Sequence, residues 1–218
     1  IRPLTTEHLV EIGPGLGALT SELIGRAGKL TLIELDRDLL PKLNQRFAQD
    51  SGWSIVSADA LNVDFTELAN HQKIRVVGNL PYNISTPLIF HLLDHADVLQ
   101  DMHFMLQKEV VSRLTAQPGS GAWGRLSIMV QYFCEAELLL DVPPEAFDPA
   151  PKVDSAVVRL IPRPPIHVAK DLDILEMVVK TAFAQRRKTL RNTLKTLFNS
   201  DQLVDLGIDP GARPETLT

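Results

Sequence analysis

The stretch NLPY, from Asn79 to Tyr82, puts four residues with complementary chemistry directly after an apolar run. Asn79 supplies a side-chain carbonyl oxygen and Leu80 a main-chain one, and two acceptors that converge on one amino group polarise both of its N–H bonds. Pro81 removes a competing donor and fixes the turn, while Tyr82 offers a flat ring on which an unstacked base can lie. The pattern indicates alkylation of an exocyclic adenine nitrogen, although Gly, Asn and Pro also form ordinary turns.

A glycine-rich loop, EIGPGLGALT at residues 11–20, supplies a candidate cofactor site. Gly13, Gly15 and Gly17 stand between an expected strand and an expected helix, where glycine lets the backbone turn tightly and approach a ligand. With Ala18 they satisfy the G-x-G-x-x-G/A fingerprint of dinucleotide binding. With Glu11 in front they also satisfy the E-x-G-x-G-x-G loop typical of S-adenosylmethionine (SAM) binding. The loop alone leaves both cofactors open.

Two further strand ends carry polar residues suited to a nucleoside. Glu34, followed by Leu35, closes the second expected strand, where a carboxylate can accept hydrogen bonds from both ribose hydroxyls. Asp59 follows the third expected strand and can accept from the adenine amino group, while Ala60 leaves room for the ring. Each acid has a simpler alternative, which is a solvated strand end for Glu34 and a helix cap or turn for Asp59.

The elements that position these residues alternate over the first 115 residues. Apolar runs predict strands at 8–12, 30–34, 53–57, 73–77 and 102–106. Helical patterns lie between and after them at 17–27, 38–48, 85–95 and 108–114, with Ser85 as the expected cap of its helix. This alternation implies a parallel sheet covered on both faces, with ligands at the carboxyl ends of the strands.

The remaining residues predict an antiparallel sheet edge and a small helical domain. Residues 126–142 read as extended, although their first half could be helical, and a proline-rich bend connects them to a strand at 155–161. Residues 162–170 look like a linker, and 172–218 are helical in pattern. We therefore expect an α/β domain at 1–162 and a helical domain at 163–218.

Composition describes a globular chain of 218 residues that is 44% hydrophobic, enough for a sizeable core. The single cysteine, Cys134, excludes an internal disulfide framework and favours a cytoplasmic location. No apolar run approaches the roughly 20 residues that span a bilayer. Because the chain opens on Ile1 rather than Met, we expect that the natural N-terminus is missing, and that the C-terminal end is also incomplete.

The net charge of −5 is unevenly distributed. Residues 1–149 have a balance of −8 and residues 150–218 a balance of +3. Five positive residues of the second part fall within ten positions: Arg186, Arg187, Lys188, Arg191 and Lys195. On a helix they would form a basic face able to meet phosphates, and the alternative is a solvated helix surface.

His91 and His95 stand four residues apart on an expected helix, which is metal-ligand spacing. No third ligand is evident nearby in the sequence, so we interpret both as structural residues and expect no metal.

Seven segments occur in an order that resembles the ribosomal RNA adenine dimethyltransferases: EIGPGLGALT, IELD, ADA, NLPYNISTP, FMLQKEV, FDPAPKVDSAVVRL and FAQRRKTLRN. The similarity runs over nearly the whole chain and is strongest to the bacterial small-subunit members of the kasugamycin-resistance type. NLPY resembles the N6-adenine methyltransferase signature D/N-P-P-Y with Leu in second place. The erythromycin-resistance enzymes, which act on large-subunit RNA, usually carry Ile there and lack FAQRRKTLRN.

The resemblance implies a Rossmann-like class I SAM-dependent methyltransferase with a seven-stranded, mostly parallel sheet and a small C-terminal helical domain that binds RNA. The implied reaction is N6,N6-dimethylation of two adjacent adenosines near the 3′ end of 16S rRNA. The implied partner is 16S rRNA in the small ribosomal subunit or its precursor, with no membrane, no metal and a monomeric enzyme. Because the sulfonium of SAM is already activated, neither a metal nor a strong general base is required.

The resemblance also assigns residues. The implied cofactor contacts are Glu11, Gly13, Gly15, Gly17, Glu34, Leu35, Asp59, Ala60 and Asn79. The implied target pocket is Asn79, Leu80, Pro81 and Tyr82, with Phe147 of FDPAPK as a second aromatic residue beside the base. On sequence alone Phe147 could equally be a loop anchor. The family's N-terminal F-G-Q-N-F-L motif, which helps cover the cofactor, is absent from these residues.

Three other functions remain open at this stage. One is the large-subunit, erythromycin-resistance type of rRNA adenine methyltransferase. A second is a non-catalytic RNA-binding or assembly factor of the same fold, against which the intact NLPY argues. The third is an NAD-dependent dehydrogenase, which Gly13, Gly15 and Ala18 permit but which has no use for NLPY.

Overall fold

The computed structural model describes residues 1–81, 83–148, 150–185 and 187–217. The chain divides into two compact units. Unit 1 comprises Ile1–Val111 and Cys134–Arg163, and unit 2 comprises Ser112–Phe133 and Pro164–Thr218. The expected domain 1–162 differs from unit 1 because Ser112–Phe133 packs with the C-terminal residues instead. Helix α6 (Arg125–Phe133) contacts helix α7 (Leu172–Ala182) there.

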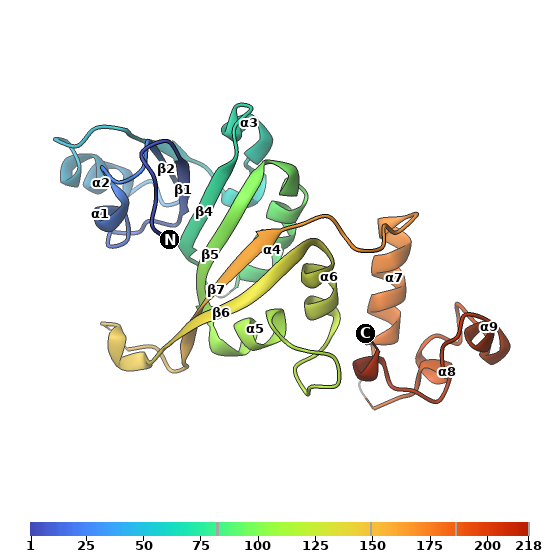
Figure 1. Ribbon diagram of the computed structural model, residues 1–218. Coiled ribbons are helices and arrows are strands. Elements are labelled where there is room, and N and C mark those ends of the chain that lie inside the picture. Colours follow the sequence, from blue (N-terminus) through green and yellow to red (C-terminus); the bar gives the residue numbers. More distant parts are fainter. Residues whose placement is uncertain (82, 149, 186, 218) are drawn as a thin grey trace. The chain divides into compact units, whose positions relative to one another are not determined.

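Unit 1 is built on a seven-stranded sheet with the order β3-β2-β1-β4-β5-β7-β6 (Figure 1). All neighbouring pairs from β3 to β5 are parallel, and β7 runs antiparallel to both β5 and β6. The predicted mostly parallel sheet with an antiparallel edge is confirmed. The strands are β1 (His8–Ile12), β2 (Lys29–Glu34), β3 (Trp53–Ser57), β4 (Ile74–Asn79), β5 (Leu99–Gln107), β6 (Cys134–Val142) and β7 (Ser155–Pro162).

The apolar runs become central strands because both faces of a parallel sheet are covered. Every residue of β1 is buried, and β4 is buried from Ile74 to Gly78. The helices are α1 (Thr20–Leu23), α2 (Leu40–Arg46), α3 (Phe65–Ala69), α4 (Ser85–Leu93), α5 (Lys108–Leu114), α6 (Arg125–Phe133), α7 (Leu172–Ala182), α8 (Leu190–Thr193) and α9 (Ser200–Asp205). Short 3-10 turns are η1 (Ala60–Asn62), η2 (Ala96–Val98), η3 (Pro144–Ala146) and η4 (Pro214–Thr216).

Several element boundaries differ from the sequence prediction. The helix expected at 17–27 is only α1, because Gly17 and Gly25 both adopt left-handed φ angles, at 84° and 73°, that a helix does not allow. Ser85 was expected to cap α4, which is wrong. Ile84 already has helical angles and is the N-cap, and the buried Ser85 is the first helical residue.

The apolar segment 126–142 is half helix and half strand. Its first half forms α6, which buries Ser127, Met129 and Val130, and its second half forms the edge strand β6. The helical alternative for the first half is therefore confirmed. An apolar run by itself does not distinguish a buried strand from a buried helix turn.

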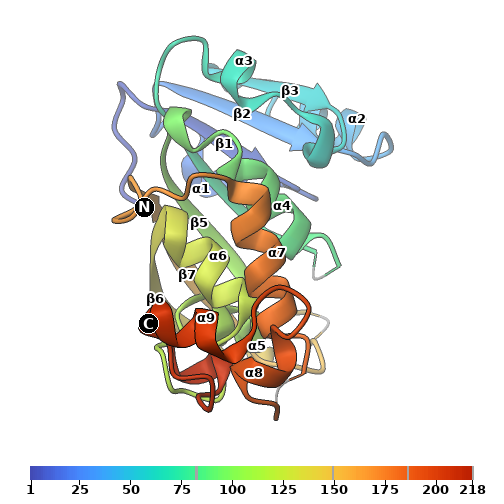
Figure 2. The same ribbon diagram turned by 90° about the vertical axis from the view of Figure 1, so that its right-hand side faces the viewer.

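Unit 2 packs α7, α8 and α9 around a small apolar core, and Figure 2 shows these helices in orange to red. Its fully buried members are Ala182, Leu190, Leu194 and Leu203. Asp171 caps α7 by accepting from the N–H of Ile174, and Asn199 forms a capping box with Gln202 at α9. The expected helical character of this part is confirmed.

Within the described ranges, no helix has the length and apolar character needed to cross a bilayer.

Candidate active site

The glycine loop after β1 adopts the conformation that its glycines were expected to provide. Gly13, Gly15 and Gly17 have φ angles of 66°, 58° and 84°, all in the left-handed region that other residues rarely occupy. A Cβ on Gly17 would lie 2.7 Å from the ring of Phe47, which is closer than packing allows. The loop therefore requires glycine both for its backbone angles and for its close packing.

Glu11 lies beneath this loop rather than at its surface. Its side chain is 1% exposed, and one carboxylate oxygen accepts a hydrogen bond from the hydroxyl of Thr20 at 2.7 Å. Burial raises the pKa of Glu11 to about 7, and the bonds from Thr20 only partly oppose that shift. The structure thus places Glu11 as a support that connects β1 to the first residue of α1.

Glu34 closes β2 and connects the glycine loop to the turn after the strand. One carboxylate oxygen accepts from the N–H of Gly15 at 3.2 Å, and the other accepts from the N–H of Asp36 at 2.9 Å. The residue is 7% exposed, so it is not the solvated strand end that was the simpler alternative. Leu35 beside it is 66% exposed. An apolar surface therefore stands next to a buried acid at this crevice.

Asp59 lies after β3, half-buried, and one carboxylate oxygen accepts from the N–H of Leu61 at 3.0 Å. It is the N-cap of η1, as the helix-cap alternative stated. Ala60, the first residue of η1, is buried.

A pocket of about 270 Å³ lies at the carboxyl ends of β1, β2 and β3. It contains five of the predicted cofactor residues, namely Gly13, Glu34, Leu35, Asp59 and Ala60. Pro81, predicted for the target pocket, also lines it, and the other described walls, which were not predicted, are Ile12, Ile33, Asp36, Ala58 and Ile84. Their position at strand ends was the available signal. The other predicted cofactor residues, Glu11, Gly15, Gly17 and Asn79, are not among the described walls.

The donor set of this pocket fits SAM. Two acids stand at neighbouring strand ends, Glu34 and Asp59, and apolar side chains such as Leu35 and Ile84 provide walls for a flat ring. The glycine loop lies at the same edge, where a Cβ would hinder a ligand's approach to the main chain. Glu34 and Asp59 would hold the nucleoside part, and the glycine loop would face the amino-acid part.

NLPY begins inside β4, which extends two residues beyond the predicted end at Val77. Asn79 is exposed and pairs with Met105 of β5. Its main-chain oxygen lies 4.0 Å from the place of a Cβ on Gly13. A Cβ on Gly78 would lie only 2.6 Å from the Ile12 oxygen, so glycine there permits β4 to pass close to β1. The main chain of Asn79 therefore lies beside the glycine loop.

The other NLPY residues divide between core and pocket. Leu80 is 1% exposed, and its N–H donates to the Met105 oxygen at 3.2 Å. Pro81 lines the pocket, and its oxygen accepts from the N–H of Ile84. Tyr82, the predicted stacking ring, lies outside the described residues. Leu80 thus anchors the turn through its side chain.

Phe147 is half-buried and follows η3, with its N–H donating to the Pro144 oxygen at 3.1 Å. The segment leaves the sheet at the end of β6, and β6 runs in the direction of the parallel strands. Phe147 therefore belongs to a loop at the same edge of the sheet as Asn79.

The predicted RNA-binding residues do not share one helix. Arg187 and Lys188 lie in the turn before α8, Arg191 lies within α8, and Lys195 lies in the turn after it. All four are exposed, and none forms an ion pair within the described part of the chain. Arg186 lies outside the described residues. The expected basic helix face is wrong, although the exposed cations remain close in sequence.

His91 and His95 contact protein groups. His91 Nε2 lies 2.9 Å from the Val63 oxygen, and His95 Nδ1 lies 2.9 Å from the hydroxyl of Thr66. Both rings pack edge to face against Phe65. These contacts agree with the structural interpretation of the pair. No cluster of three or more candidate metal ligands occurs among the described residues.

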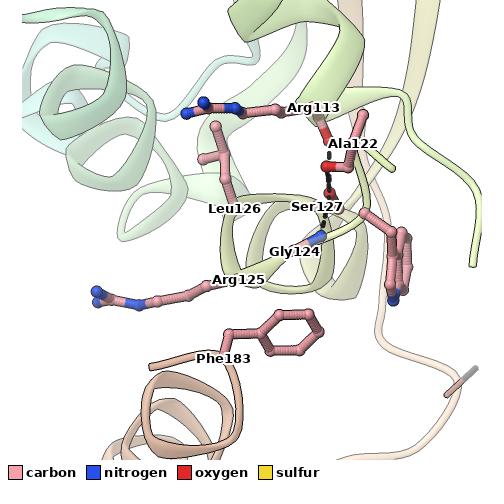
Figure 3. Close-up of a pocket in the computed structure, with 8 residues that line it drawn as sticks. Arg113, Ala122, Gly124, Arg125, Leu126, Ser127 and Phe183 are labelled. Carbon is pink, nitrogen blue, oxygen red and sulfur yellow. Dashed lines mark hydrogen bonds between the residues drawn. The ribbon is translucent and has the colours of Figure 1, made fainter. Parts of the chain in front are cut away.

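A separate pocket of about 290 Å³ lies in unit 2 (Figure 3). Ser127 connects two of its walls: the Ser127 hydroxyl donates to the Arg113 oxygen at 2.6 Å and accepts from the Gly124 N–H at 3.1 Å. Figure 3 shows the side chains of Arg113 and Arg125 extending to the same side. Arg125 is ion-paired with Glu176. These contacts close the turn between α5 and α6, and the described walls of this pocket all belong to unit 2.

Strand order and strand-end crevice define the class of protein. A seven-stranded sheet ordered 3-2-1-4-5-7-6, with a glycine loop after β1 and an acid at the end of β2, is the class I SAM-dependent methyltransferase fold. The model of the Ribosomal RNA adenine dimethylase family matches residues 1–216, and the chain belongs to this family. SAM is accordingly its cofactor, and the NAD alternative is wrong.

Individual relatives give the same result. The Ribosomal RNA small subunit methyltransferase A of Pseudomonas aeruginosa is 59% identical over 213 residues, which are 97% of this chain and 80% of that protein. The protein of the same name from Hahella chejuensis is 57% identical over 220 residues, covering 100% of this chain and 80% of that protein. The expected resemblance is confirmed.

Two solved structures share the fold along nearly the whole chain. A dimethyladenosine transferase from Plasmodium falciparum superposes with a TM-score of 0.82 at 27% identity, covering 99% of this chain and 86% of that one. The 23S rRNA methyltransferase ErmE superposes with a TM-score of 0.75 at 28% identity, covering 98% of this chain and 89% of that one.

Proposed function

We propose that this protein transfers methyl groups from SAM to the N6 atoms of two adjacent adenosines near the 3′ end of 16S rRNA, within the small ribosomal subunit or its precursor. The observation that carries the proposal is the position of Asn79. The residue is exposed at the end of β4, and its main chain lies beside Gly13. The small-subunit relatives at 57–59% identity support the choice of RNA.

The chemistry needs a weak nucleophile to be held in line with a methyl group. SAM supplies that methyl on a positively charged sulfur, which is a good leaving group. The side-chain oxygen of Asn79 accepts from one N–H of the target amine, and the Leu80 carbonyl accepts from the other. Pro81 presents no N–H that could compete for these oxygens. The adenine amine is thereby oriented and its lone pair made more available.

Aromatic side chains would then hold the extruded base. Tyr82 follows Pro81 directly and is proposed as the ring beneath the adenine, and Phe147 approaches from the loop after β6. A base held between two rings is ordered and shielded from water, which favours transfer to nitrogen. In this proposal the exposed residues Arg187, Lys188, Arg191 and Lys195 of unit 2, together with Arg186, bind RNA phosphates.

The test is incubation of the protein with labelled SAM and unmodified small subunits, followed by nucleoside analysis. Dimethyladenosine at two adjacent positions near the 3′ end of 16S rRNA is the expected product. Large subunits from the same preparation serve as the competing substrate, because ErmE shares the fold. Label that appears only in 23S rRNA would favour the large-subunit alternative. Absence of label from both would favour a non-catalytic assembly factor.

A further inference from the structure

The segment between β6 and β7, residues 143–154, leaves the sheet beside the end of β5 (Figure 1). Ser155 pairs with Val142 on one side and with Gln107 on the other. The end of β6, the start of β7 and the end of β5 therefore form one row. We call residues 143–154 the Phe147 loop, after the aromatic residue that it carries.

Lys108, the residue after β5, contacts both ends of this loop. Its main-chain N–H donates to the Asp154 oxygen at 2.9 Å. Its Nζ donates to Oδ2 of Asp141, also at 2.9 Å. Asp154 is the last residue of the loop, and Asp141 lies two residues before its first. A single residue thus bridges the two stems.

The hydrogen bonds within the Phe147 loop join residues close in sequence. The N–H of Ala146 donates to the Pro143 oxygen at 3.0 Å, and the N–H of Phe147 donates to the Pro144 oxygen at 3.1 Å. Among the described residues of the loop, the hydrogen bond to the rest of unit 1 is the one from Lys108 to Asp154. The direction in which the loop leaves the sheet therefore depends on its stems.

Lys108 also has a fixed relation to the target end of β4. Asn79 pairs with Met105, and Lys108 follows Met105 by three residues on the same chain segment. The residue that bridges the loop stems is thus anchored to the strand that flanks Asn79.

We propose that Lys108 is a positioning residue for methyl transfer, which sets the place of Phe147 relative to Asn79 by bridging Asp141 and Asp154. The proposal rests on the proposed function, in which Phe147 packs beside the target adenine. Lys108 acts through the loop and does not touch the reacting atoms. The two side chains of the ion pair are 44% and 53% exposed, so the pair adds little to stability and its loss acts on the loop rather than on the fold.

The first test compares methyl transfer to unmodified small subunits at saturating SAM. Lys108→Met and Asp141→Asn should each lower kcat about fivefold, because a misplaced contact residue reduces the fraction of productive complexes and an exposed ion pair can shift that fraction only this far. SAM affinity and the thermal unfolding midpoint should stay unchanged. Lys108→Arg should retain kcat within about twofold, since guanidinium also pairs with a carboxylate. The double variant should lose no more than either single one.

The matched control is Glu137→Gln. Glu137 pairs with Arg159 across β6 and β7, the two strands that the Phe147 loop connects, with similar exposure but away from the loop. Its removal should leave kcat unchanged. A loss as large as that of Lys108→Met would mean that any charge pair on this edge matters, which would overturn the assignment.

The second test needs no RNA and so separates this proposal from the proposed function. Amide hydrogen exchange of the Phe147 loop should be up to about fivefold faster in Lys108→Met and Asp141→Asn, and unchanged in Glu137→Gln. Unchanged exchange in the first two variants would overturn the bridge, whatever the activity. A normal kcat in Asp141→Asn alongside a low kcat in Lys108→Met would also overturn it. If exchange is faster in the two variants but the wild-type protein itself methylates no RNA, the bridge holds and the proposed function is refuted.

Discussion

The main-chain oxygen of Asn79 lies 4.0 Å from the point that a Cβ on Gly13 would occupy. The parallel pairing of β1 with β4 brings these two residues together. Glu11 lies opposite Val77, and Gly13 and Asn79 each follow two positions later. A ligand bound at the glycine loop would therefore lie next to the main chain of Asn79. The juxtaposition explains why two motifs 66 residues apart in the sequence can serve one reaction.

Asn79→Ala should reduce methyl transfer at least about 100-fold, because it removes an acceptor that orients the target amine in the transition state. The exposed position at the strand end predicts a change in unfolding free energy within about 0.5 kcal/mol. The measurement is the single-turnover rate with labelled SAM, together with urea unfolding.

Asn83→Ala is the control for this prediction. Asn83 is an exposed amide four residues further along, and it should be replaceable with little effect on the rate. Normal turnover by Asn79→Ala would remove the mechanism proposed for NLPY.

Gly17→Ala should weaken both folding and SAM binding more than Gly119→Ala. The two glycines have the same φ of 84°, so alanine introduces the same backbone strain at each. A Cβ on Gly17 would also lie 2.7 Å from the Phe47 ring, whereas nothing lies within 4 Å at Gly119. Overpacking against the buried Phe47 should add roughly 1–3 kcal/mol of destabilisation. Urea unfolding and calorimetric titration with SAM give the two readouts, and equal losses in both variants would contradict the packing argument.

The sequence predicted the sheet and the crevice better than the ends of the elements. Apolar runs identified the parallel strands, because both faces of such a sheet are buried, and the residues after β1, β2 and β3 were therefore placed at one edge. Helix ends depended on angles that composition does not show, such as the left-handed Gly25 after α1.

Tertiary packing explains the remaining differences between the sequence predictions and the structure. The basic residues were expected on one helix, but α7 ends at Ala182, and a turn in which the Lys188 N–H donates to the Gln185 oxygen precedes α8. Leu190 and Leu194 are buried in the core of unit 2, which fixes the short helix there. Likewise, Glu11 matched a cofactor motif, but its bond to Thr20 depends on how α1 lies over β1 and is not visible in the spacing.

Glu11 should make stability fall as pH rises from about 4.5 to about 7. Burial raises the pKa of this carboxyl to about 7 from its ordinary value of 4.5. The folded state then holds the proton more tightly than the unfolded state, so the contribution is present below pH 4.5 and is lost as pH rises through 7. A shift of this size corresponds to roughly 3 kcal/mol in unfolding free energy. Glu11→Gln removes this titration.

Urea unfolding of both proteins across this range checks the prediction for Glu11. Subtracting the unfolding free energy of Glu11→Gln from that of the wild type at each pH cancels the titration of every other group. A pH-independent difference would show that the carboxyl titrates alike in the folded and unfolded states. Thr20→Val removes the hydroxyl that bonds to the carboxylate and should move the transition to higher pH.

Reversing the charges of Arg187, Lys188 and Arg191 should weaken RNA binding uniformly and flatten its salt dependence. Each neutralised phosphate contributes about one unit to the slope of log affinity against log salt, so three lost contacts predict a slope smaller by about 2–3. SAM affinity should not change, because the cofactor crevice lies in unit 1. Lys180→Glu is the matched control, since Lys180 is an exposed cation on α7 of the same unit. Filter binding to small subunits between low and moderate salt measures the slope. An unchanged slope in the triple variant would make these residues solvated surface, and an equal change in Lys180→Glu would reduce the effect to the net charge of unit 2.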